Sequence, residues 1–143
     1  MTGPRGHRRR RELTDRDYEA LARFRHALRV FLRFSEDAAG GEGLTSNQHQ
    51  LLLAIRGFSG AEPPTIGDVA AMLVLHHNST VELVGRAVDA GLVVRTPDPV
   101  DRRRQRLSLT RTGDAKLARL TAAHRDELRR FRVDLSSALR DLG

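Results

Sequence analysis

The densest concentration of chemically useful side chains in this 143-residue sequence is a run of arginines in its C-terminal half. Residues 101–106 read Asp-Arg-Arg-Arg-Gln-Arg, so four positive charges stand against one negative charge. A planar guanidinium group binds two phosphate oxygens at once, which suits such a run to a nucleic-acid backbone. A GC-rich genome would also enrich arginine, so the position of the arginines in the fold has to distinguish phosphate binding from codon composition. The run lies between two strand-like segments, where a merely solvated charge run is less expected.

The other reactive residues exclude the common catalytic classes. The sequence has no Cys, which excludes disulfides, thiolate zinc sites and thiol redox sensing. It also lacks the GxGxxG, Walker, GxSxG and HExxH motifs, and no pair among its six His is spaced i,i+4. We therefore expect no enzyme activity, no cofactor and no metal site.

Composition also bears on location. The chain carries a formal charge of +7, and 25 of its residues are Lys or Arg. It has no run of about 20 apolar residues, as a membrane span would need, and no apolar segment follows its basic N-terminus. We expect a cytoplasmic protein with no membrane partner. Residues 1–12, with four consecutive Arg at 8–11, are expected to form a flexible basic arm.

Hydrophobic periodicity predicts the elements that position these side chains. The predicted helices cover residues 14–39, 45–56, 65–73, 77–90 and 111–143, and the predicted strands cover 92–95 and 106–109. Asp68 three residues after Thr65 is typical of a capping box, and Gly91 suits the end of a helix. Pro97 and Pro99 should keep the turn between the strands out of the ladder. The predicted fold class is mainly α with a small β-hairpin.

The order of short helix, turn, helix and hairpin is that of a winged helix-turn-helix, with its wing at about residues 92–109. In such motifs the second helix enters the DNA major groove. The candidates for contacts with base edges are therefore its exposed polar residues His77, Asn78, Ser79 and Glu82. Asn binds adenine with two hydrogen bonds, and Glu accepts from the amino group of cytosine.

Several further residues have two possible roles. Arg86 is either a phosphate clamp or the i,i+4 ion-pair partner of Glu82, and we favour the clamp. Thr65 caps its helix or presents backbone N–H groups to a phosphate. At the wing, Arg102, Arg103 and Arg104 are candidates for the minor groove, where negative potential is concentrated. One of these three arginines should pair with Asp98 or Asp101 and stiffen the tip.

The two terminal helices carry apolar stripes that a small winged domain does not cover. A second copy of the chain is the simplest partner, so we expect a homodimer. The residues expected in its interface are Leu21, Phe24, Leu28, Leu128, Phe131, Leu135 and Leu139.

Several motifs in this region carry a family resemblance. Residues 65–70 read Thr-Ile-Gly-Asp-Val-Ala, and residues 83–86 read Leu-Val-Gly-Arg. Residues 98–103 read Asp-Pro-Val-Asp-Arg-Arg, and residues 109–113 read Leu-Thr-Arg-Thr-Gly. With these motifs, residues 64–113 resemble the multiple-antibiotic-resistance regulator (MarR) family of bacterial transcription factors. The wing motif is the most specific part, and flanking helices of the right length extend the resemblance over nearly the whole chain.

The resemblance implies a homodimer whose terminal helices (13–40 and 111–143) interlock and whose lobes (44–110) straddle a palindromic operator on double-stranded DNA. It also implies repression that is relieved by a small aromatic or phenolic effector, bound between the dimer helices and the lobe. The candidate pocket residues there are His49, Phe34, His26 and Arg56. At the wing, one arginine enters the minor groove and another pairs with an Asp. The family pattern favours Arg102 or Arg103 for these roles, in either order.

The sequence also departs from this family. His76 stands where Ser or Thr often begins the recognition helix, and Val81 and Glu82 replace its usual central residues. Residues 76–90 carry one Arg against two acids, a net charge of −1, so phosphate attraction should come mainly from the wing. Two alternatives follow: a winged-helix dimer for protein–protein interaction with weak DNA binding, and a metal-responsive regulator.

Overall fold

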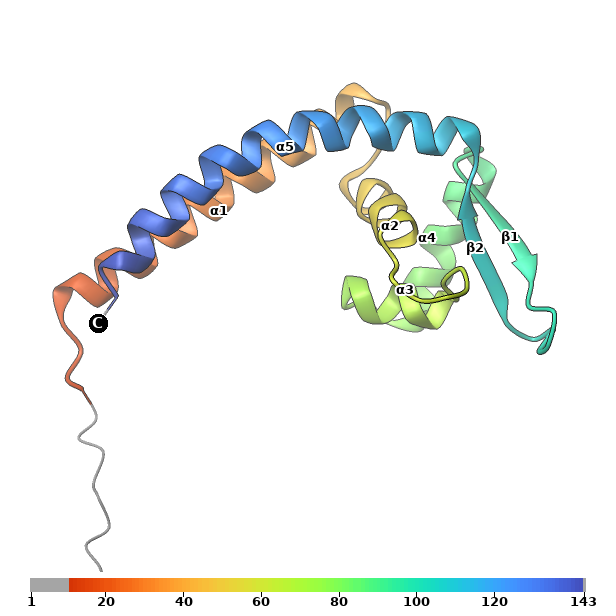
Figure 1. Cartoon of the computed structure of the whole chain (residues 1–143), viewed down its shortest axis with the longest axis horizontal. Helices are drawn as coiled ribbons and strands as arrows, with labels where there is room; N and C mark the ends of the chain where they lie inside the picture. Colours follow the sequence, from red (N-terminus) through yellow and green to blue (C-terminus); the bar gives the residue numbers. More distant parts are fainter. Residues whose placement is uncertain (1–10, 143) are drawn as a thin grey trace, which may run out of the picture.

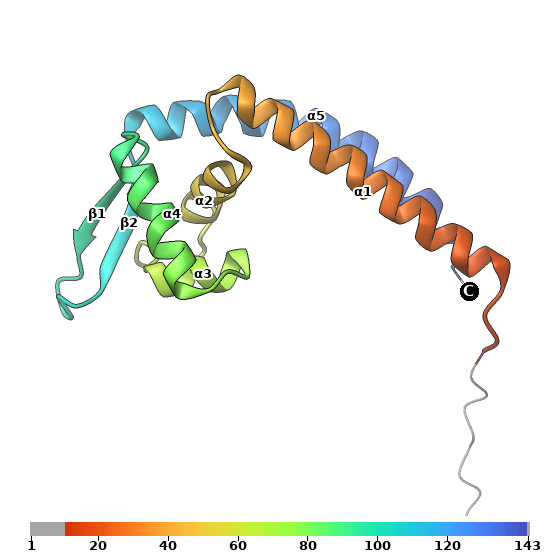
Figure 2. The same cartoon turned by 180° about the vertical axis from the view of Figure 1, so that it is seen from behind.

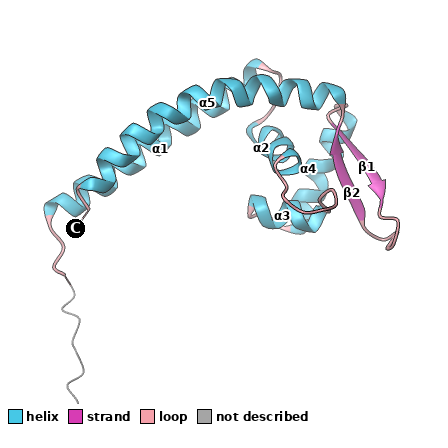
Figure 3. Cartoon of the chain, viewed as in Figure 1, coloured by secondary structure: helices cyan, strands magenta, loops and turns pink. Residues whose placement is uncertain are grey.

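The computed structural model describes residues 11–142, which form five helices and one two-stranded antiparallel sheet (Figures 1 and 3). The helices are α1 (Asp15–Gly41), α2 (Ser46–Arg56), α3 (Ile66–Leu73), α4 (His77–Asp89) and α5 (Arg111–Arg140). The strands are β1 (Val93–Pro97) and β2 (Gln105–Leu109). The predicted fold class and order of elements are confirmed. The expected basic arm lies outside the described residues except for Arg11 and Glu12.

The two long helices α1 and α5 lie side by side and form an arm that extends away from the rest of the chain (Figures 1 and 2). The rings of Phe31 and Phe131 pack between them, with centroids 5.1 Å apart. Part of the apolar stripe that we assigned to a second copy is thus covered within one chain. Each long helix covers part of the other's apolar stripe, which the comparison with the small lobe alone does not take into account.

The remaining elements form a lobe beneath the N-terminal half of α5 (Figure 1). Its core is centred on α2, whose Leu51 and Leu52 are fully buried. Val84 of α4 and Leu107 of β2 are fully buried in the same cluster. Burying large aliphatic side chains contributes about 1.5–3 kcal/mol each, so this cluster fixes the orientation of α4 and the hairpin.

The helices of the lobe begin where local chemistry predicted. The Thr45 hydroxyl accepts a hydrogen bond from the Gln48 amide (3.1 Å), and the Thr110 hydroxyl accepts one from the Gly113 amide (3.0 Å). At α3 the Asp68 amide donates to the Thr65 hydroxyl, and the Thr65 amide donates to the Asp68 carboxylate. This reciprocal arrangement is the predicted capping box. Gly91 ends α4 with a φ of +74°, as expected for a left-handed position.

The hairpin is longer than predicted, because β1 continues through Thr96 to Pro97, which pairs with Gln105. The expectation that Pro97 would stay outside the ladder was wrong. The Asp98 amide donates to the Arg104 carbonyl (2.9 Å), so the adjacent Pro97–Gln105 pair is of the non-hydrogen-bonded type. A residue at such a position points its nitrogen away from the neighbouring strand, so proline there costs no ladder bond.

An ion pair fixes the corner where the arm meets the lobe. The Glu42 carboxylate, just after α1, accepts two hydrogen bonds from Arg119 of α5, at 2.9 and 3.0 Å. Lys116 donates to the Glu42 carbonyl at 2.7 Å. Hydrogen bonding to Arg119 lowers the pKa of Glu42 from its ordinary value. The α1–α2 corner is therefore tied to the N-terminal third of α5.

Candidate nucleic-acid interface and cavity

Helix α4 presents a polar face to solvent and an apolar face to the core. Its buried residues are Thr80, Val84 and Ala87. The residues predicted to contact bases or phosphates are all exposed: His77, Asn78, Ser79, Glu82 and Arg86. Since the core fixes the opposite face, this polar face is rigidly displayed and fits the role of a recognition surface.

Arg86 was predicted to be either a clamp or the ion-pair partner of Glu82. Among the described residues 11–142, no ion pair joins Glu82 to Arg86, and no hydrogen bond holds the Arg86 guanidinium. The charged end of Arg86 is therefore available to an external anion, as the favoured role requires.

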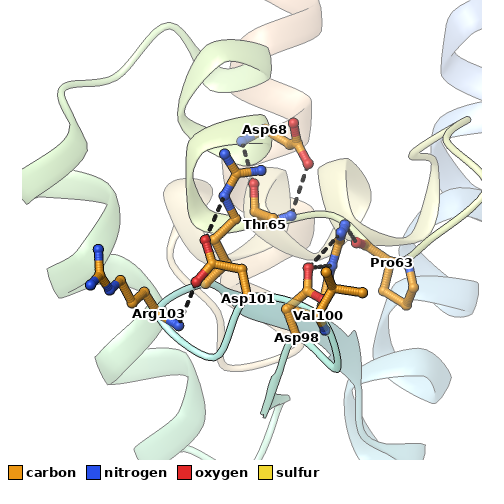
Figure 4. A network of polar contacts seen from close by, with 9 residues as sticks. Pro63, Thr65, Asp68, Asp98, Val100, Asp101 and Arg103 are labelled. Carbon is orange, nitrogen blue, oxygen red and sulfur yellow. Dashed lines mark hydrogen bonds and ion pairs between the residues drawn. The ribbon is translucent and has the colours of Figure 1, made fainter.

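A buried carboxylate organises the wing turn (Figure 4). Asp98 is 7% exposed and accepts hydrogen bonds from the Val100 amide (2.9 Å) and from Nε and Nη2 of Arg106 (3.1 and 2.8 Å). Arg106 also donates to the Pro63 carbonyl at 2.8 Å. These bonds tie the wing to the loop before α3. The Val100 amide, followed by Arg106, lowers the pKa of Asp98.

The pairing within the wing differs from the family-based expectation. Asp98 is held by Arg106, which had not been singled out, and Asp101 lies 3.9 Å from Arg104. Arg103 contacts Asp101 only through its backbone amide (3.1 Å). Within the part of the chain that the structure describes, the guanidinium groups of Arg102 and Arg103 have no hydrogen-bond or ion-pair partner. Two free arginines therefore project from a stiffened tip.

The structure brings four of the predicted DNA-contacting residues to one hollow of about 540 Å³. The hollow lies between the starts of α3 and α4 and the wing, and Thr65, His77, Arg103 and Arg104 are among its lining residues. Arg103 and Arg104 give the hollow positive side chains that suit contact with a DNA backbone, and Asp68 is its acidic lining residue. The Thr65 amide is occupied by Asp68, which favours the capping role for Thr65.

A second, larger cavity of about 700 Å³ lies at the junction of arm and lobe, between α1, α2 and α5. Its apolar lining comes from Phe31, Leu32, Leu53 and Leu128, and its charged lining from Glu36, Arg125 and Arg129. A mostly apolar cavity with a few polar groups is typical of a small-molecule site.

The inner wall of this cavity carries two histidines from different helices. The rings of His49 (α2) and His124 (α5) have centroids 4.8 Å apart. His124 is bonded at both nitrogens, through Nδ1 to the Leu120 carbonyl (2.6 Å) and through Nε2 to the Ser35 hydroxyl (2.8 Å). His49 is 2% exposed, and its Nδ1 is buried with no hydrogen-bond partner among the described residues. Burial, followed by the nearby His124, lowers the pKa of His49.

The four residues predicted for the pocket fall in different places. His49 lines the cavity, and Phe34 packs edge-on against His124 with centroids 5.2 Å apart. His26 is exposed and lies nine residues before Ser35, which places it on the opposite face of α1. Arg56 lies two turns beyond His49 on α2 and pairs with Asp114 at 3.5 Å. Of the four, only His49 lines this cavity, because Phe34, His26 and Arg56 are not among its lining residues.

Sequence reasoning missed Ser35, Arg125 and Arg106. Ser35 and Arg125 lie on faces of α1 and α5 that are recognisable only once the two helices are packed together. Arg106 carried a usable signal, because an acid at the start of a predicted turn and a base just after it are well placed to pair across a hairpin.

The residues predicted for a dimer interface form two groups. Phe24, Leu28, Phe131 and Leu135 are half-buried between the long helices of one chain. Leu21, Leu128 and Leu139 are 55%, 47% and 49% exposed. The second group is exposed to water in the single chain, with Leu128 at the arm–lobe cavity and Leu21 near the N-terminal end of the arm.

Two findings concern metals and membranes. Within residues 11–142, no group of three or more His, Cys, Asp or Glu side chains is placed to hold a metal ion. None of the helices in this range is long and apolar enough to cross a bilayer.

Comparisons with known proteins point in one direction. Residues 42–104 match the model of the MarR family. A protein of Thauera aromatica, described as a candidate transcriptional regulatory protein for the hcr operon, is 29% identical over 116 residues, or 81% of this chain and 68% of that protein.

Two solved structures share the fold over much of the chain. The structure of AbsC, a MarR family transcriptional regulator from Streptomyces coelicolor, superposes with a TM-score of 0.72 at 25% identity and covers 87% of this chain and 84% of its own. The structure of CouR from Rhodococcus jostii RHA1, bound to p-coumaroyl-CoA, gives a TM-score of 0.60 at 28% identity over 68% of this chain and 67% of its own.

Proposed function

We propose that this chain, which belongs to the MarR family of transcriptional regulators, is a homodimeric repressor that binds a palindromic operator and is released from it by a small aromatic ligand. The observation that carries the proposal is the combined surface of α4 and the wing. It joins a rigid polar helix face to two free arginines and to the hollow that Arg103 and Arg104 line.

In this proposal α4 reads base edges in the major groove, and Arg102 and Arg103 reach the adjacent minor groove or its phosphates. Helix α4 contributes little phosphate attraction, because it has one Arg against two acids. Most of the electrostatic affinity therefore comes from the wing. The Asp98–Arg106 pair holds the wing in position for this contact.

The dimer is supported by the exposed apolar residues of the arm. Leu21, Leu128 and Leu139 are each about half exposed, so the arm leaves apolar side-chain area that a second copy would cover. Two copies joined through their arms would place their two α4 helices in successive major grooves, which lie about 34–36 Å apart along DNA.

The ligand is supported by the cavity at the junction of arm and lobe, whose volume of about 700 Å³ is within the range of small-molecule sites. It is also supported by the related structure of CouR, which was solved with p-coumaroyl-CoA. A ligand between α1, α2 and α5 lies where a small displacement changes the angle between arm and lobe.

Fluorescence anisotropy tests the proposal. The full-length protein is titrated into labelled DNA from beside its own gene and into a scrambled duplex, at two salt concentrations. Affinity for the native DNA that is greater by about a thousandfold or more supports a specific regulator. Equal and salt-sensitive binding to both duplexes contradicts it and favours a winged-helix dimer for protein–protein interaction.

The same assay tests base reading by α4. Asn78→Ala should weaken binding to the native DNA by about 1–3 kcal/mol and leave the affinity for scrambled DNA almost unchanged. Asn47→Ala, at an exposed position on α2, is the matched control. An equal loss on both duplexes would make Asn78 a phosphate contact. A reporter gene behind the native DNA then distinguishes repression from activation.

A further inference from the structure

Helix α4 carries two consecutive side chains of nearly equal shape in the opposite order from the one that burial favours. Thr80 is fully buried, and its hydroxyl donates to the His76 carbonyl at 3.0 Å. The next residue, Val81, is 37% exposed on the outer face of the helix. Valine has a methyl group where threonine has a hydroxyl, so the reverse order would place the methyl in the core and the hydroxyl in water. Sequences that break such a local rule tend to do so at functional positions.

The next turn of α4 leaves Val81 uncovered. The side chain of a helical residue leans back over the residues three and four positions before it, so residue 85 is the one placed to cover Val81. Residue 85 is a glycine, and a Cβ added there would stand in open space, with no packing contact in the described chain. Glycine in the middle of a helix lowers its stability relative to alanine, and no close contact requires one here. The helix therefore keeps an apolar contact point open to the outside.

The groups around Val81 are suited to DNA. Asn78 and Glu82 are exposed one turn before and one residue after it, and both side chain types can bond to base edges. The start of α4 also borders the hollow that Arg103 and Arg104 line. An apolar point within a polar face that has arginines beside it matches the major groove, where thymine presents a C5-methyl group among hydrogen-bonding atoms.

We propose that Val81 contacts the C5-methyl group of a thymine in each half of the operator, and that this contact makes α4 select thymine at that position. The inference rests on the proposed function and names a group on the DNA that the proposed function leaves open. Asn78 and Glu82 supply hydrogen bonds to adenine or cytosine, whereas a methyl group is recognised only by an apolar surface. The contact removes the thymine methyl and the Val81 methyls from water, so its contribution is hydrophobic.

Removing the thymine methyl measures this contact directly. Deoxyuridine lacks the C5-methyl group and pairs with adenine in the same way as thymidine. Burial of one group of this size changes an affinity about fourfold, so two half-sites give a change of about 15-fold.

Fluorescence anisotropy of the full-length protein compares the native DNA with the same duplex carrying deoxyuridine in place of every thymidine. We expect the wild-type protein to bind the second duplex about 15-fold more weakly. In Val81→Ala most of this ratio should disappear, because the side chain that contacts the methyl is gone. The matched control is Val133→Ala, at a 66% exposed position on α5, which should keep the full ratio. A scrambled duplex with and without the exchange should give a ratio near one.

Equal affinity of the wild-type protein for the two native duplexes would overturn the inference, and this comparison does not depend on the folding of any variant. A ratio that persists in full in Val81→Ala would also contradict it, since another residue would then contact the methyl. In either case, a retained preference for native over scrambled DNA leaves the proposed function standing. Absence of that preference in thymidine-containing DNA contradicts both the inference and the proposed function.

Discussion

Removing the two free wing arginines should change how DNA binding depends on salt. Arg102 and Arg103 have no partner within the described chain, whereas Arg104 lies 3.9 Å from Asp101 and Arg106 is bonded to Asp98. Each phosphate neutralised by a protein contributes about 0.9 to the slope of log K against log salt. If both wings of a dimer contact the operator, the double variant Arg102→Ala/Arg103→Ala loses four phosphate contacts. Its slope of log K against log salt should then be smaller in magnitude by about 3.6.

This difference in slope predicts that the two proteins lose very different amounts of DNA affinity as salt rises. Between about 50 and 200 mM salt, a fourfold change, the wild-type protein should lose roughly 150-fold more affinity than the double variant. Anisotropy titrations at four salt concentrations give both slopes. The control is Arg33→Ala/Arg130→Ala, which removes the same charge from exposed positions on the arm. An unchanged slope in the wing variant, or an equal drop in the control, would refute the assignment of these arginines to DNA.

Three further predictions follow from particular contacts. Asp98→Asn should weaken operator binding by releasing Arg106. Because the folded-state pKa of Asp98 is lowered, its charge stabilises the wild type above the unfolded pKa, and this stability is lost as pH falls through the folded pKa. Thermal melts in acid should therefore fall more steeply for the wild type than for the variant. Gly113→Ala should destabilise the fold by about 3 kcal/mol in urea, because its Cβ would lie 2.2 Å from the Leu92 carbonyl oxygen. Gly85→Ala, with no atom within 4 Å of its Cβ, should instead add up to about 1 kcal/mol. Leu128→Asp should give monomers by light scattering, since it puts a charge into an apolar surface; a stable dimer would place the interface elsewhere.

Features that depend on neighbours in the chain were predictable from the sequence. Thr65 caps its helix as predicted, and Thr14, Thr45 and Thr110 stand at the N-caps of three others; such positions are readable from sequence because a cap involves residues only three apart. The polar face of α4 followed from helical periodicity in the same way. The prediction that Pro97 stays outside the ladder was wrong because a proline's effect on a strand depends on which way its nitrogen points. That direction depends on the register of the turn.

Features that depend on packing between distant segments were not predictable. Ser35 and His124 are 89 residues apart in sequence, and their hydrogen bond exists only because α1 lies beside α5. Arg106 reaches the carbonyl of Pro63, 43 residues earlier, because the loop before α3 runs beside the start of β2. Single-sequence patterns report the face of a helix but not which other face it meets, so the residues of α1 and α5 that line the cavity were recognisable only in the fold.

The arrangement of α2 explains how a ligand in the cavity would act on DNA binding. Helix α2 lines the cavity through Ser46, His49, Gln50 and Leu53, and its other face packs against α3, α4 and β2. Because that face is the centre of the lobe core, α2 cannot move without carrying the recognition helix and the wing with it. The Glu42–Arg119 pair holds the near end of α2 against α5, so it offers a fixed point about which such a movement would turn. A ligand that separates α2 from the arm by a small distance would therefore change the spacing of the two recognition helices in a dimer, and that spacing has to match the helical repeat of DNA.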